Sequence, residues 1–150
     1  MEQFRVDGRV AIITGAGGNP SLGRAHALLL AARGASVVVN DIAADPEARH
    51  YPGRASAEAV AAEIRAGGGT AIACEASVAT PEGAEAIVTA ALAAFGRLDI
   101  LINNAGISIG APIDAMSARD IARHIDVNLM GTIWCARAAW PHMKAQGYGR

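Results

Sequence analysis

Four short apolar runs alternate along the chain with longer segments whose apolar residues recur at helical spacing. The runs cover residues 9–14 (RVAIIT), 36–40 (SVVVN), 70–74 (TAIAC) and 98–102 (LDILI). The centres of the first two runs are continuously apolar, which is typical of strands buried on both faces of a parallel sheet. Strands that alternate with helices in this way predict an α/β fold with right-handed crossovers.

The segments between the runs carry signals that begin and end helices. Ser56, Thr80 and Ser117 can each cap the N-terminus of a helix, and Thr80 is followed by a proline and an acidic residue. Pro141 is expected to kink or split the last helix, because proline lacks the N–H that a helix interior needs. The expected helices are 22–33, 57–66, 81–95 and 118–146, and a surface loop is expected at 43–55 (AADPEARHYPGRA).

Composition narrows the class of protein. The 150 residues are 52% hydrophobic but only 4% aromatic, so we expect one ordered domain whose core is filled mainly by alanine and small aliphatic side chains. The formal net charge is −1 and there is no basic stripe, which argues against nucleic acid or a membrane surface as partner. No apolar run approaches the roughly 18 residues that a membrane-spanning helix needs.

The cysteines and histidines suggest no metal chemistry. Cys74 and Cys135 lie far apart and fit no metal-ligand spacing, so we expect two reduced, buried thiols. The four histidines form neither an HExxH pair nor a cluster, and no metal site is predicted. Residues 1–8 lack the apolar region of a secretory signal, and together these features predict a cytoplasmic protein.

The first apolar run leads directly into a glycine-rich segment, residues 14–24 (TGAGGNPSLGR). Glycine lets a backbone turn tightly and approach a pyrophosphate, towards which the first N–H groups of the next helix point. Plain turns also use glycine, and Asp41 at the end of the second run, taken alone, is a solvated turn residue. The loop followed by an acid about twenty residues later is, however, the pattern of a dinucleotide site, and it predicts NAD binding.

Several ordered motifs resemble those of the short-chain dehydrogenase/reductase family. They are Thr14-Gly15 with Leu22-Gly23, then Asp41, Asn103-Asn104-Ala105-Gly106 and Val127-Asn128-Leu129. The Asn-Asn-Ala-Gly motif directly after the fourth run is far more specific than a glycine pattern. The resemblance covers residues 8–150 and implies a Rossmann-like doubly wound parallel sheet, with four strands in the order 3-2-1-4, in a single NAD-binding domain over 1–150.

The resemblance also implies roles for individual residues. Asp41 should bind the adenosine ribose, and Asn128 should hold a water of the proton relay. Ser77-Val78 should lie beside the adenine. The residues that should line the pyrophosphate and the nicotinamide ribose are Gly15, Gly17, Gly18, Asn19, Ser21, Leu22 and Gly23. Those that should close over the cofactor are Asn104, Ala105 and Gly106.

Two features depart from the family pattern. Gly15 and Gly23 are two residues further apart than TGxxxGxG allows, and Asn19-Pro20-Ser21 replaces the middle glycine, so the loop should bulge. Ser77 stands where the family usually has an aspartate beside the adenine. The long segment after Asp41 and the Ser77-Val78 pair also resemble the hydroxyacyl-CoA dehydrogenase part of peroxisomal multifunctional enzymes type 2.

The proton-transfer residues of the family are absent from the chain. The family uses a serine and a YxxxK pair whose tyrosine acts as acid/base. Tyr51 is followed four residues later by Ala55, and Tyr148 has only two residues after it. We therefore expect the chain to be truncated before the fifth strand, to leave residues 98–102 as an unprotected sheet edge, and to be inactive by itself.

Two classes of function stay open from the sequence. The resemblance implies a homo-oligomeric enzyme that transfers a hydride between NAD and a small-molecule alcohol or ketone. The alternative is a finished, non-catalytic nucleotide-binding or interaction module. The substrate itself is not specified by these residues.

Overall fold

The computed structural model describes residues 4–42 and 56–150. Within them, the sheet has four parallel strands in the order β3-β2-β1-β4. These strands are β1 (Val10–Ile13), β2 (Ser36–Asn40), β3 (Thr70–Cys74) and β4 (Ile100–Ile102). The α/β class, the Rossmann-like parallel sheet and the predicted strand order are thereby confirmed. The loop expected at 43–55 lies outside the described residues.

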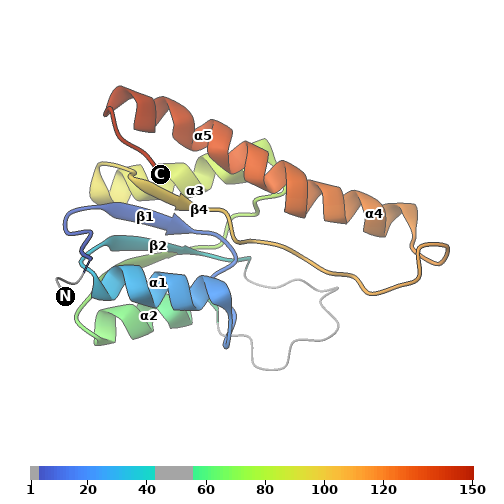
Figure 1. Ribbon diagram of the computed structural model, residues 1–150, viewed down its shortest axis with the longest axis horizontal. Helices are drawn as coiled ribbons and strands as arrows, with labels where there is room; N and C mark the ends of the chain where they lie inside the picture. Colours follow the sequence, from blue (N-terminus) through green and yellow to red (C-terminus); the bar gives the residue numbers. More distant parts are fainter. Residues whose placement is uncertain (1–3, 43–55) are drawn as a thin grey trace.

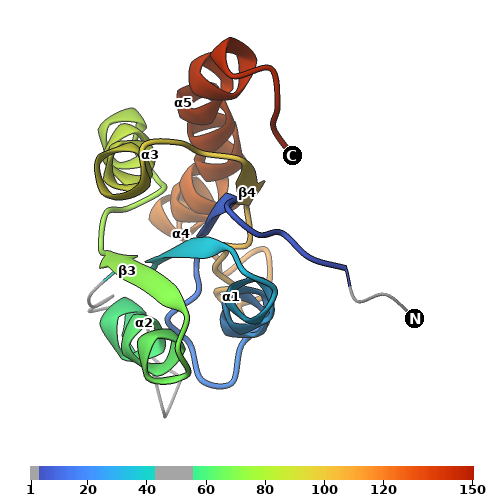
Figure 2. The same cartoon turned by 90° about the vertical axis from the view of Figure 1, so that its left-hand side faces the viewer.

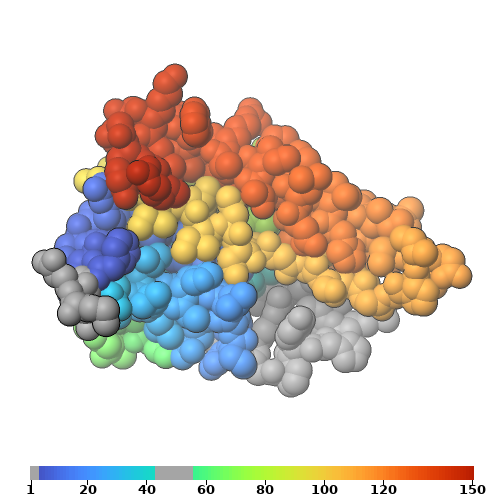
Figure 3. Space-filling view, viewed as in Figure 1, coloured from blue at the N-terminus to red at the C-terminus, as the bar shows by residue number. Residues whose placement is uncertain are grey.

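Helices cover both faces of the sheet (Figures 1 and 2). One face carries α1 (Leu22–Ala32) and α2 (Ala57–Ala66). The other face carries α3 (Pro81–Phe95) and α5 (Gly131–Ala145). A further helix, α4 (Ala118–His124), continues the line of α5 past the carboxyl ends of the strands, and this part projects at the right of Figure 3.

Alternate residues of each central strand serve the two helical layers. Ala11 and Ile13 of β1 pack with Val37 and Val39 of β2 in the core beneath α1 and α2. The intervening residues, such as Ile12, pack beneath α3 and α5. All four residues of β1 are buried, as the continuous apolar run predicts. Each fully buried isoleucine or valine stabilises the fold by about 1.5–3 kcal/mol relative to an exposed one.

Small side chains let α3 and α5 lie close together. Ala84 and Ala91 of α3 and Ala139 of α5 are at most 1% exposed, which agrees with the expected alanine-rich core. Both cysteines are free. Cys135 is buried on α5, and burial raises the pKa of its thiol to about 11, whereas Cys74 is only partly buried.

The predicted helix caps are present. The Ser56, Thr80 and Ser117 hydroxyls each accept a hydrogen bond of 3.1 Å from the backbone N–H three residues later. These bonds satisfy N–H groups that have no partner inside the helix. At the other end of α3, Gly96 has φ +76°, the left-handed conformation that favours glycine after a helix.

Pro141 was predicted to kink or split the last helix, and the split does not occur. Helix α5 continues through Pro141 to Ala145, because proline removes one backbone bond while the packing of α5 on α3 holds the neighbouring turns. The interruption lies earlier, where a π-helical segment, η1 (Ile125–Met130), separates α4 from α5. Single π-helical turns often occur at functional sites, and η1 contains Asn128.

The edge of β4 is also less bare than expected. The Arg150 N–H donates to the Asp99 carbonyl at 2.9 Å, and the Leu101 N–H donates to the Arg150 carbonyl at 2.8 Å. These two bonds follow the pattern of a parallel ladder. Backbone pairing beside β4 therefore includes Arg150.

Candidate nucleotide-binding site

The carboxyl ends of three neighbouring strands meet at one edge of the sheet. Thr14-Gly15 follows β1, Asp41 follows β2, and Asn103-Asn104 follows β4, all at the end of the sheet nearest α4 (Figure 1). The strand order reverses between β1 and β4, and doubly wound sheets bind ligands in the crevice at this switch point. The fold thus gathers the predicted motifs, which lie up to about ninety residues apart.

The turn after β1 leaves no room for side chains. Gly15 has φ +64°, and a Cβ there would lie 2.7 Å from the Cα of Ala105. A Cβ on Gly23 would lie 2.5 Å from the Gly15 carbonyl oxygen and 2.6 Å from Nδ2 of Asn104. Glycine at both positions therefore lets the start of α1, the turn and the Asn-Asn-Ala-Gly segment pack directly on one another.

The start of α1 is arranged to face an anion. The Ser21 hydroxyl caps the helix by accepting from the Arg24 N–H at 3.1 Å, and it donates to the Gly18 carbonyl at 3.0 Å. Helices α2, α3 and α4 each carry an acidic residue in their first turn, whereas α1 carries none. The positive end of the α1 dipole is therefore not neutralised by its own side chains.

The extra loop residues lie at the surface. Asn19 and Pro20 are exposed, as expected of residues that bulge from the loop. Leu22, the first residue of α1, is 73% exposed. Its side chain leaves apolar surface open at the start of α1.

Thr14 and Asn104 tie the glycine turn to the segment after β4. The Thr14 hydroxyl accepts from the N–H groups of Asn104 and Ala105, both at 3.0 Å. The Asn104 side chain donates to the carbonyls of Thr14 and Gly15 at 2.8 and 3.0 Å. The Asn104 amide is thus spent on shaping the turn, and its N–H donors are directed at backbone rather than outwards.

Asp41 contacts the glycine turn directly. Its Oδ2 accepts a hydrogen bond of 2.8 Å from the Gly17 N–H. A Cβ on Gly17 would lie 2.9 Å from the Asp41 Cβ, so the glycine allows this approach. The bond places a carboxylate beside the turn, where the ribose of a dinucleotide lies in this kind of fold.

Ser77 and Val78 make contacts mainly within the protein. The Ser77 hydroxyl accepts from the Ala79 N–H at 3.2 Å, and Gly83 of α3 packs on the Ser77 carbonyl. Val78 is 7% exposed and packs directly on Gly131 of α5, where an added Cβ would lie 2.8 Å from the Val78 side chain. The Val78 side chain therefore has little surface left for a cofactor.

The Asn128 side chain bonds to the backbone of Ile107 at both ends of its amide. Its Oδ1 accepts from the Ile107 N–H at 2.8 Å, and its Nδ2 donates to the Ile107 carbonyl at 2.9 Å. Gly106 lies against the same amide, since a Cβ there would be 3.4 Å from Oδ1. In this arrangement Asn128 positions the chain after Gly106, and its exposed amide has the capacity for further hydrogen bonds.

Sequence reasoning gave no role to three polar residues at this edge. Thr14 connects the two motifs described above. Asn40 is 1% exposed and donates to the carbonyls of Cys74 and Ala76 at 2.9 and 2.8 Å, which joins the ends of β2 and β3. His124 accepts from the Ile109 N–H at 3.0 Å. For Thr14 and Asn40 a signal existed, because each is a polar residue that ends a continuously apolar strand.

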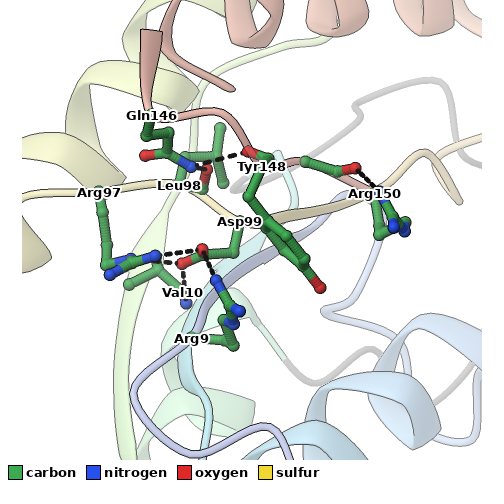
Figure 4. Close-up of polar contacts among 9 residues, drawn as sticks. Arg9, Val10, Arg97, Leu98, Asp99, Gln146, Tyr148 and Arg150 are labelled. Atoms are coloured by element: carbon green, nitrogen blue, oxygen red, sulfur yellow. Dashed lines mark hydrogen bonds and ion pairs between the residues drawn. The ribbon is translucent and has the colours of Figure 1, made fainter. Parts of the chain in front are cut away.

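A second polar cluster lies at the opposite edge of the sheet (Figure 4). The Asp99 side chain is fully buried and accepts from the Val10 N–H at 3.0 Å, from Arg9 at 2.8 Å and from Nε and Nη2 of Arg97. Arg9 also stacks on the Tyr148 ring, 3.8 Å from its centroid. The cluster fastens the starts of β1 and β4 to the last residues of the chain.

Burial and pairing act in opposite directions on the Asp99 carboxyl. Burial by itself would raise its pKa. The bonds from Arg97, from the Val10 N–H and from Arg9 outweigh burial and hold the pKa of Asp99 below its ordinary value. Asp99 is therefore a structural anion, away from the crevice.

Other kinds of site find little support in the described part of the chain. No three His, Cys, Asp or Glu side chains there lie close enough to hold a metal ion. None of its helices is long and apolar enough to cross a membrane. A cavity of about 320 Å³ between α3 and α5 contains none of the predicted site residues; it is lined by Pro81, Glu85, Trp134, Arg137, Ala138, Pro141 and His142.

Comparison with known proteins decides the family. The model of the family described as short chain dehydrogenase matches residues 9–150. The chain belongs to the short-chain dehydrogenase family. Its relatives are oxidoreductases, so the alternative of a non-catalytic module is not favoured.

Individual curated relatives resemble the chain along nearly its whole length. The mouse (Mus musculus) peroxisomal multifunctional enzyme type 2 is 47% identical over 147 residues, which are 98% of this chain and 19% of that protein. The similarity agrees with the subfamily resemblance seen in the sequence. The chain spans only about a fifth of this relative.

Solved structures agree with the fold. A short-chain dehydrogenase from Mycobacterium avium has a TM-score of 0.82 at 40% identity, covering 97% of this chain and 51% of that one. A 7α-hydroxysteroid dehydrogenase, solved with NADH and 7-oxo-glycochenodeoxycholic acid, also has a TM-score of 0.82, at 36% identity, covering 97% of this chain and 52% of that one.

Proposed function

We propose that residues 1–150 form the NAD(H)-binding part of a dehydrogenase that interconverts a secondary alcohol and a carbonyl compound. The observation that carries the proposal is the bond from the Gly17 N–H to Asp41, which fixes an acid beside a glycine turn at the switch point of the sheet. The family membership and the NADH bound to the 7α-hydroxysteroid dehydrogenase support a nicotinamide cofactor.

The residues fit a dinucleotide in three respects. Glycine at positions 15 and 17 lets the turn pack closely on Ala105 and Asp41, which sets its shape beside the start of α1. The N-terminus of α1 supplies N–H groups and positive potential that no acidic residue of its first turn offsets. Asp41 supplies an acceptor for ribose hydroxyls. When bound, the nicotinamide would accept or donate the hydride.

The described residues bind and orient rather than transfer protons. The 150 residues contain no YxxxK pair, so we propose that they supply the cofactor site and, taken alone, do not turn over substrate. Asn128 would contribute by holding Ile107 and the adjoining Gly106 in place. The substrate class is proposed only as far as secondary alcohols and ketones, with hydroxyacyl thioesters as candidates because of the similarity to the multifunctional enzyme.

Asp41 should make the protein prefer NAD over NADP. A 2′-phosphate would be repelled by the carboxylate, and neither Ile42 nor Ala43 in the sequence supplies a positive charge to bind it. We expect a preference of about thirtyfold, or about 2 kcal/mol, and a much smaller one in Asp41→Ala. Titration calorimetry of the whole protein with NADH and NADPH measures both affinities.

The matched control is Glu75→Ala, which removes an exposed acid that follows β3 at the same edge of the sheet. It should leave the preference unchanged. Equal or tighter binding of NADPH by the wild-type protein, or an equal response of the two variants, would contradict the assignment of Asp41.

Two further expectations stay proposals. The first is self-association. It is supported by an exposed apolar stripe at four-residue spacing on α4, η1 and α5, and light scattering can test it; the members of the stripe are Ile121, Ile125, Leu129 and Ile133.

The second is a cytoplasmic location, whereas the mouse relative is named as peroxisomal. Imaging of a fluorescent fusion of the whole protein would distinguish the two compartments.

A further inference from the structure

The chain that follows the Asn-Asn-Ala-Gly motif is hydrogen-bonded to α4 and η1 at two points. Ile107 is held by Asn128, and Ile109 is held by His124. Asn128 lies four residues after His124, on the π-helical segment that continues α4. Their partners Ile107 and Ile109 are two residues apart, so the two contacts form successive rungs between chain and helix. The family motifs imply no role for His124, which makes the second of these contacts.

The second rung exists only while His124 is neutral. Its Nε2 accepts the Ile109 N–H at 3.0 Å, and an N–H can only donate, so Nε2 must carry its lone pair. Its Nδ1 lies 2.8 Å from the Asp120 carbonyl oxygen, which can only accept, so Nδ1 carries the proton. A proton added to Nε2 would place two donors face to face and break the rung.

Asp120, whose backbone carbonyl contacts His124, does not change its charge in the range where histidines ordinarily do. The bond from the Ser117 hydroxyl to the Asp120 carboxylate, 2.7 Å long, is the main cause that lowers the pKa of Asp120, which therefore stays ionised at pH 5–8. Histidine is the side chain whose charge ordinarily changes in that range. Of the other charged residues nearby in the sequence, Asp114 precedes α4, Arg119 and Arg123 lie on α4, and Asp126 lies on η1.

We propose that His124 is a pH-sensitive positioning residue, which holds residues 107–109 against the helix when neutral and releases them when protonated. The segment continues from Gly106, and Asn104 of the same motif shapes the glycine turn. Release would loosen this side of the nucleotide site, so cofactor affinity would fall with acidification. The effect on affinity rests on the proposed function, whereas the effect on the segment does not.

Hydrogen exchange of the whole protein, followed by mass spectrometry of peptides that span residues 106–112, tests the proposal. Protection factors, which are corrected for the intrinsic effect of pH, would be compared at about pH 8 and pH 5.5, where histidine changes its charge. His124→Gln keeps an acceptor near the position of Nε2 but cannot be protonated, and His124→Leu removes the acceptor. NADH titrations of the same samples report on the site.

We expect wild-type protection to fall about fivefold on acidification, as for the loss of one hydrogen bond. Protection in His124→Gln should stay constant, and in His124→Leu it should be low at both pH values. NADH affinity should likewise fall on acidification in the wild type, stay constant in His124→Gln and be low at both pH values in His124→Leu. Identical pH dependence in the wild type and His124→Gln would overturn the proposal. If no variant binds NADH at either pH, the proposed function and the effect on affinity both fail, while exchange still decides whether His124 holds the segment.

Discussion

Replacing Gly23 by alanine should destabilise the protein by about 3 kcal/mol and weaken NADH binding at least tenfold. The added Cβ would lie 2.5 Å from the Gly15 carbonyl oxygen and 2.6 Å from Nδ2 of Asn104, which is closer than such contacts can be. Overpacking of a well-packed site typically costs about 1–3 kcal/mol, and here the neighbours are backbone and a fixed amide that cannot move aside. Urea unfolding and NADH titration measure the two effects.

Gly67→Ala is the matched control for this prediction. Gly67 follows α2 with φ −80°, and a Cβ there would meet its nearest atom at 3.5 Å, an ordinary contact. The variant should keep wild-type affinity and change the free energy of unfolding by less than about 1 kcal/mol. A Gly23→Ala protein with wild-type stability and affinity would mean that the turn, the start of α1 and Asn104 do not pack as described.

Replacing Asp99 by asparagine should cost about 2–3 kcal/mol of stability. The carboxylate is fully buried and accepts from Arg9, Arg97 and the Val10 N–H, and the shape of asparagine is the same without the charge. Breaking a buried pair typically costs about 3–5 kcal/mol, but the arginine side chains are 34% and 43% exposed, so water will recover part of the loss.

The same carboxylate should make stability depend on pH. Because the folded-state pKa of Asp99 lies below its ordinary value of about 4, its contribution is present above that value and is lost as the pH falls through the folded-state pKa. Wild-type stability should therefore decline below about pH 4 more steeply than that of Asp99→Asn. Thermal melts from about pH 3 to 7 would show whether the curves converge in acid.

The exposed pair Arg5–Asp7 provides the control for Asp99. The two aspartates each pair with an arginine two residues earlier, but the Asp7 side chain is 59% exposed and that of Asp99 is fully buried. Asp7→Asn should change stability by less than about 1 kcal/mol. Equal losses of stability in the two variants would contradict the claim that burial makes the Asp99 ion pairs more stabilising than the exposed Arg5–Asp7 pair.

Local signals explain how much of the fold was predictable. A helix cap such as Thr80 bonds to a group three residues away, so its partners are visible in one stretch of sequence. Buried parallel strands such as β1 are visible as continuous apolar runs. The strand order came from the family resemblance, because periodicity alone does not say which strands are neighbours.

The contacts that shape the site were much less predictable. Asp99 is joined to Val10 across 89 residues, and Asn104 to Thr14 across 90, so neither pair has a local pattern. The resemblance named Asn104 and Asn128, but it did not indicate that their amides bond to backbone groups, as the structure shows. Pro141 was misleading because the penalty of a proline is local, whereas the packing of α5 on α3 is not.

The most direct test of the account is the difference in hydrogen exchange of the whole protein with and without saturating NADH. We predict protection at residues 14–24 and 104–109, at the carboxyl edge of the sheet, and no change around Asp99 at the opposite edge. Absence of binding, or protection confined to the edge that carries Asp99, would contradict the claim that the glycine turn, Asp41 and the Asn-Asn-Ala-Gly segment form a nicotinamide dinucleotide site.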